Sequence, residues 1–127
     1  DMVIIPINPD PYAMDGMEFT ISEIDRINKE FKLNITTKIV WNRFDSRERL
    51  GPIYLHNLVK DKDKIEKILP VVIRVDASLK NAIFEEQSIF NFSKRSGGIK
   101  EDFDQLTCEI LGINQWKENQ KQTLLRA

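Results

Sequence analysis

Three short runs of apolar, mostly β-branched residues constrain the fold of this 127-residue chain more than any other feature. They cover residues 2–7, 35–41 and 69–75, and each has the length and composition of a buried strand. Between the first two runs, from Pro11 to Phe31, apolar residues recur every three or four positions, which is typical of a helix with one buried face. Strands and helices therefore alternate along the chain, and we predict an α/β fold, a mostly parallel sheet with flanking helices.

Local signals predict where several helices begin and end. Asp10 is placed to cap the first helix, and Pro11 occupies its first position, where a missing N–H costs least. The residues expected to face the sheet from this helix are Met14, Met17, Ile21, Ile24, Ile27 and Phe31. Further along, the same reasoning predicts a helix from near Arg47, a short helix over 78–87, an extended segment over 88–92, and a helix that follows Ser96-Gly97-Gly98 and stops at Gly112.

Composition excludes several classes of function. The 19 Lys and Arg residues balance 20 Asp and Glu residues, for a net charge of −1, so nucleic acid could bind only at a local basic patch. One cysteine, Cys108, and one histidine, His56, cannot form a disulfide within the chain or a Cys/His zinc site. We interpret Cys108 as a packed thiol and His56 as a structural or surface residue. The sequence contains no Gly-rich phosphate loop and no apolar run that would span a membrane. We expect one cytoplasmic domain over 1–112 and a polar helical tail over 113–127.

The strongest candidate for chemistry lies at the end of the second apolar run. Asn42 and Arg43 would stand at the carboxyl end of a parallel strand, which is the edge where such sheets bind ligands. An asparagine amide offers a donor and an acceptor that suit the Watson–Crick edge of adenine, and an adjacent guanidinium can stack on the base. The alternative is a simple turn, in which Asn42 caps the loop and Arg43 and Arg47 are solvated.

A second candidate is a local basic surface. Its possible members are Arg47, Arg49, Arg74, Lys80, Lys94 and Arg95. Such a surface could contact phosphates, each contact adding a modest, salt-dependent gain. The alternative is that these charged residues only increase the solubility of the protein.

Five segments, taken in order, resemble the carboxyl-terminal half of the ParA/Soj/MinD family of deviant-Walker P-loop ATPases. They are the opening strand Asp1–Pro6, the helix entry Pro9–Met17, the sequence Phe44-Asp45-Ser46-Arg47, the segment Ile73–Ala82, and Ser96-Gly97-Gly98. The resemblance implies the carboxyl-terminal portion of a P-loop NTPase fold that binds ATP with Mg²⁺. It also implies a homodimer formed on ATP binding, non-specific DNA and a ParB-like activator as partners, no membrane, and a role in plasmid or chromosome partitioning.

The resemblance assigns roles to particular residues. Asn42, Arg43 and Arg74 would line the adenine side of the nucleotide site, although the family has a proline at the position of Arg74. Arg47 matches an arginine that contacts DNA in Soj-like members. A second such arginine aligns with Ser78, which leaves Lys80 as the nearest cation. Lys94 and Arg95 would extend the same surface.

The Walker A lysine and the Walker B aspartate would precede Asp1, so this chain by itself is not expected to hydrolyse ATP. An apolar strand that follows Asp1 directly is typical of a piece of a longer protein. One alternative is a non-catalytic α/β interaction module that lacks a P-loop. Another is a MinD-like ATPase associated with membranes, whose basic terminal helix the tail resembles only weakly.

Overall fold

The computed structural model describes residues 1–92 and 97–113, which belong to two compact units. The first unit comprises Asp1–Ile73 and contains the sheet, and the second begins at Arg74. Over these described ranges, no helix combines the length and the apolar character needed to cross a membrane.

The sheet of the first unit has three parallel strands, in agreement with the α/β prediction. The strands are β1 (Met2–Ile7), β2 (Thr36–Phe44) and β3 (Ile68–Arg74), in the spatial order β1-β2-β3. Along β1 and β2 the register pairs Ile7 with Trp41, so the two strands reach the carboxyl edge of the sheet side by side. The finer assignment to a P-loop NTPase fold stays a prediction.

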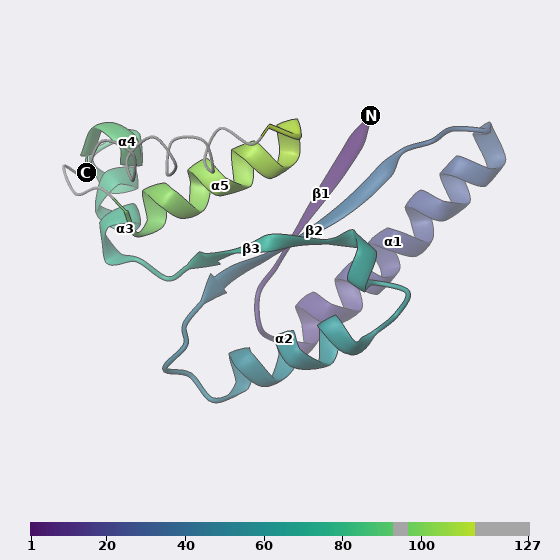
Figure 1. Ribbon diagram of the computed structural model, residues 1–127, viewed down its shortest axis with the longest axis horizontal. Helices are drawn as coiled ribbons and strands as arrows, with labels where there is room; N and C mark the ends of the chain where they lie inside the picture. Colours follow the sequence, from purple (N-terminus) through teal and green to yellow (C-terminus); the bar gives the residue numbers. More distant parts are fainter. Residues whose placement is uncertain (93–96, 114–127) are drawn as a thin grey trace, which may run out of the picture. The chain divides into compact units, whose positions relative to one another are not determined.

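Helices α1 (Pro11–Phe31) and α2 (Leu50–Lys60) cover one face of this sheet (Figure 1). The expected start of α1 is confirmed, because the Asp10 carboxylate accepts a 2.7 Å hydrogen bond from the N–H of Ala13. The fully buried core between helices and sheet consists of Ile7, Met17, Ile39, Trp41 and Leu58.

The predicted apolar stripe of α1 is confirmed except at its last member. Met17 and Ile24 are buried, but Phe31 is 63 % exposed. Twenty-one helical residues span about 31 Å, whereas the six residues of β1 span about 20 Å. The last turn of α1 therefore extends past β1.

Two boundaries at the carboxyl edge differ from the prediction. Strand β2 continues to Phe44, so Asn42 and Arg43 are strand residues and the loop begins at Asp45. Phe44 packs against the core, which explains why the strand continues through two polar positions. Helix α2 begins at Leu50, three residues later than expected.

The two outer strands carry a proline, Pro6 in β1 and Pro70 in β3, whereas the central strand has none. Proline lacks the N–H that a central strand needs and is tolerated at sheet edges. The N–H of Thr36 in β2 donates to the carbonyl of Asp1 at 3.1 Å. Because alternate residues of a strand direct their backbone groups to the same side, the odd-numbered residues of β1 bond to β2 and the even-numbered residues direct theirs outward. The nitrogen of Pro6 therefore lies on the outer side of β1.

The described part of the second unit contains helices α3 (Ala77–Phe84), α4 (Ile89–Phe92) and α5 (Ile99–Leu111). Helix α3 confirms the expected short helix but ends at Phe84, three residues before the predicted end at residue 87. Helix α5 ends as predicted, because Gly112 adopts the left-handed conformation (φ 67°) that closes helices.

The extended segment expected over 88–92 is wrong, because residues 89–92 form the single turn α4. Ser88 explains this turn. Its hydroxyl accepts from the N–H of Phe90 (3.2 Å), and its carbonyl accepts from the N–H groups of Asn91 and Phe92. Apart from Ile113, the expected tail lies outside the described residues.

Candidate functional site

Two asparagines meet at the carboxyl edge of the sheet. Asn42 lies near the end of β2, and Asn8 follows the last residue of β1. The Asn42 Nδ2 donates to the Asn8 Oδ1 at 3.4 Å. Both side chains are half-buried, and within the described ranges the carbonyl oxygen of Asn42 accepts no hydrogen bond. One donor and one acceptor of the Asn42 amide are thus available to a ligand.

Arg43 has an unusual backbone conformation for a strand residue, with φ at 52°. Two other described non-glycine residues share a positive φ, Lys32 and Glu86, but both follow helices, where the left-handed conformation is common. Arg43 is exposed, and its guanidinium makes no hydrogen bond or ion pair with any residue that the structure describes. Strain of this kind costs about 1–3 kcal/mol and is concentrated at functional sites.

Arg47 is fixed to the loop after β2 by a neighbouring carboxylate. Its Nε and Nη2 donate to the two oxygens of Asp45 at 2.9 Å each, and its backbone N–H donates to the same group at 3.0 Å. The Arg47 hydrogen bonds lower the pKa of Asp45 to about 2, and the carboxylate raises the pKa of Arg47. The Arg47 side chain is nevertheless 86 % exposed, so an anion can reach it from solvent.

Arg74 is held by Asp102, in the first turns of α5. The Nε, Nη2 and backbone N–H of Arg74 donate to this carboxylate at 2.7, 2.8 and 3.1 Å. These bonds raise the pKa of Arg74. One edge of the guanidinium, formed by Nε and Nη2, is therefore occupied within the protein.

The predicted site residues fall into separate groups. Asn42, Arg43 and Arg47 form one short segment of the first unit. Arg74 is the last residue of β3 and the first residue of the second unit, where Lys80 is exposed on α3. Lys94 and Arg95 lie outside the described residues.

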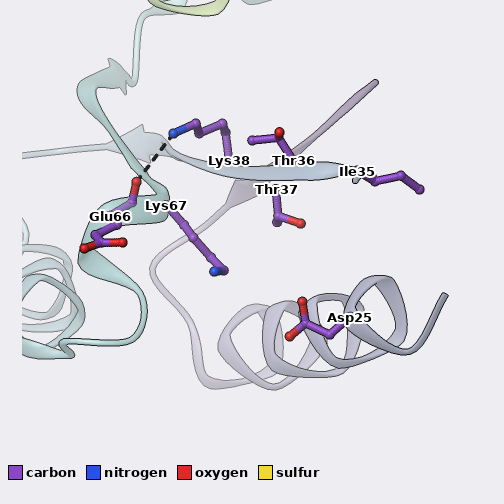
Figure 2. A pocket seen from close by; sticks show the side chains of 7 residues that line it. All are labelled: Asp25, Ile35, Thr36, Thr37, Lys38, Glu66 and Lys67. Atoms are coloured by element: carbon purple, nitrogen blue, oxygen red, sulfur yellow. Dashed lines mark hydrogen bonds between the residues drawn. The ribbon is translucent and has the colours of Figure 1, made fainter. Parts of the chain in front are cut away.

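The hollows that the structure describes in the first unit lie elsewhere, and sequence reasoning missed them. One, of about 260 Å³, surrounds the start of β2 at the amino edge of the sheet (Figure 2). It is lined by residues 35–38 together with Asp25, Glu66 and Lys67. A second hollow, of about 440 Å³, shares Asp25 and Lys67 and extends along α1. The one sequence signal was a pair of threonines, Thr36 and Thr37, at the start of an apolar run.

Comparison with known proteins gives no match to this chain, either among protein-family models or among curated proteins. Within residues 1–92 and 97–113, no group of three or more His, Cys, Asp and Glu side chains could hold a metal ion.

Proposed function

We propose that this chain is the carboxyl-terminal segment of a ParA-like partition ATPase and supplies the adenine-side wall of its ATP site. The observation that carries the proposal is the contact between Asn8 and Asn42. It puts two amide side chains together at the carboxyl ends of neighbouring parallel strands, which is where parallel α/β sheets bind their ligands.

In this proposal the Asn42 amide recognises the adenine edge, because its free oxygen can accept from the exocyclic amine while an N–H donates to a ring nitrogen. Arg43 stacks its guanidinium on the base. The strained backbone of Arg43 supports this role, because a ligand contact would justify a conformation that costs stability. Phosphates and Mg²⁺ would be held by a P-loop that another segment contributes.

The same proposal assigns a DNA-facing surface to Arg47, with Lys80, Lys94 and Arg95 as further contacts. The Asp45 carboxylate orients Arg47 and leaves its outer N–H groups in solvent, as a phosphate contact requires. ATP binding would then bring two copies together on non-specific DNA, and a ParB-like protein would stimulate hydrolysis.

The test of the adenine wall is an ATP titration of the polypeptide that joins this chain to the phosphate-binding segment. Asn42→Ala should weaken ATP binding on the order of tenfold, the effect of losing a good hydrogen bond in a site. Asn57→Ala, at an exposed position of α2, is the matched control and should bind ATP normally. Unchanged affinity in Asn42→Ala would remove the basis of the proposal.

The DNA surface has its own test. Arg47→Glu should weaken DNA binding and reduce the dependence of the affinity on salt, because a phosphate contact is lost. Arg26→Glu reverses a charge of α1 that lies between Glu23 and Glu30 and serves as the control. Equal DNA affinity in the wild type and Arg47→Glu would contradict the assignment.

A second candidate function is a non-catalytic interaction module. The observation that favours it is a pair of aromatic side chains on α1, Tyr12 and Phe19, which are 87 % and 68 % exposed and lie seven residues apart on one helix face. A Gly-rich loop with a lysine, encoded upstream of Asp1 in the parent gene, would favour the ATPase. An unrelated domain there would favour the module.

A further inference from the structure

The hollow at the amino edge of the sheet is lined by a hydroxyl that has no partner among the described residues. Thr37 is 8 % exposed, and its side chain extends from β2 toward the side where α1 carries Asp25 (Figure 2). This hydroxyl makes no hydrogen bond with any residue in the described ranges. Because this hydroxyl lines the hollow, it can donate a hydrogen bond to a ligand that enters there.

Four charged side chains line the same hollow, those of Asp25, Lys38, Glu66 and Lys67, and the opposite charges of Asp25 and Lys67 lie on the side of β2 toward which Thr37 extends (Figure 2). Asp25 on α1 and Lys67 on η1 (Ile65–Lys67) both border it, yet neither side chain forms an ion pair with a described residue. The neighbouring Lys64 behaves differently, because Glu18 and Asp61 each hold its ammonium group at 2.7 Å. The side chains of Asp25 and Lys67 are therefore available to a ligand, whereas Lys64 is already paired with two carboxylates.

We propose that this hollow binds a small zwitterion of the size of a free α-amino acid. The ligand carboxylate would accept from the Lys67 ammonium and from the Thr37 hydroxyl, and the ligand ammonium would donate to Asp25. A volume of about 260 Å³ has room for a molecule of this size. A ligand with a single charge would leave either Asp25 or Lys67 without a partner. This site is at the opposite edge of the sheet from Asn42 and does not depend on the proposed nucleotide site.

The first test compares four probes by NMR titration of the chain. Glycine and L-alanine should shift the amide signals of residues 36–38 and 66–67. Acetate and methylammonium each carry one of the two charges and should bind on the order of tenfold more weakly, because one charged hydrogen bond is missing. The proposal is wrong if the single-charge probes bind as tightly as glycine, or if no probe binds at millimolar concentration.

The second test uses variants. Thr37→Val nearly keeps the shape of the side chain, removes its hydroxyl, and should weaken glycine binding on the order of tenfold. Lys67→Met should also weaken binding, whereas Lys62→Met, at an exposed loop position, should not. Unchanged glycine affinity in Thr37→Val would overturn the proposal.

Discussion

Arg74 and Asp102 form a hydrogen-bonded ion pair whose two members differ sharply in exposure. The Asp102 side chain is 8 % exposed, whereas the Arg74 side chain is 50 % exposed. Three donors of Arg74 converge on the carboxylate, at 2.7, 2.8 and 3.1 Å. Removing one partner should therefore cost a different amount of stability from removing the other.

Arg74→Met is expected to be the more damaging change. The variant removes both guanidinium donors and leaves the buried Asp102 carboxylate with only the backbone N–H of residue 74 from this pair. Because an uncompensated buried charge is unfavourable, the cost should be about 3 kcal/mol. Asp102→Asn instead leaves a guanidinium that is half in water and can be solvated again. Its cost should be about 1.5 kcal/mol, the lower end for a hydrogen bond to a charged group.

Urea denaturation followed by circular dichroism measures both costs, and the double variant completes the cycle. Amide hydrogen exchange in α5 shows whether the loss occurs in the second unit. The reasoning is refuted if Asp102→Asn costs as much as Arg74→Met. If Arg74 acts only on a nucleotide, Arg74→Met will change ATP affinity and leave the free energy of unfolding unchanged.

Three further predictions concern single side chains and glycines. Asp10→Ala should lower the free energy of unfolding by about 1 kcal/mol, because α1 loses its capping bond, whereas Asp10→Ser should be nearly silent in urea denaturation. Gly16→Ala should raise the free energy of unfolding by about 0.5–1 kcal/mol, because a Cβ at this position meets nothing within 4 Å. Gly98→Ala should lower it by about 1–2 kcal/mol, because Gly98 has a positive φ of 61°. Thermal unfolding compares the two variants, and equal shifts would contradict the argument. The carboxyl signal of Asp45 should titrate with a pKa of about 2, and this pKa should rise toward 3.8 in Arg47→Met. The stabilisation from this pair is therefore complete above pH 3.8 and is lost as the pH falls through 2.

The sequence predicted the strands and the long helices because their signals are local. Asp10, Pro11 and the apolar stripe lie within a few turns of one another, and Gly112 marks its helix end by itself. The end of β2 was not predictable in this way. Asn42 and Arg43 are polar, and the strand continues through them because Phe44 packs into a core built by distant segments.

The candidate site was predictable only in part. Neighbouring parallel strands place their next residues together, so the position of Asn42 at the sheet edge followed from the α/β pattern. The link between Arg74 and Asp102 joins residues 28 positions apart, and no periodicity indicates such a contact. The positive φ of Arg43 is equally hidden, because arginine has no preference for that conformation.

The proline of β1 limits how this sheet can grow. On the outer side of β1, Met2 and Ile4 offer backbone donors to an added strand, but Pro6 offers none. A further strand could pair along the first half of β1 and would have to diverge near the carboxyl edge. The gap opened by that divergence would border Asn8, so any strand added there would leave the amide pair accessible from the side.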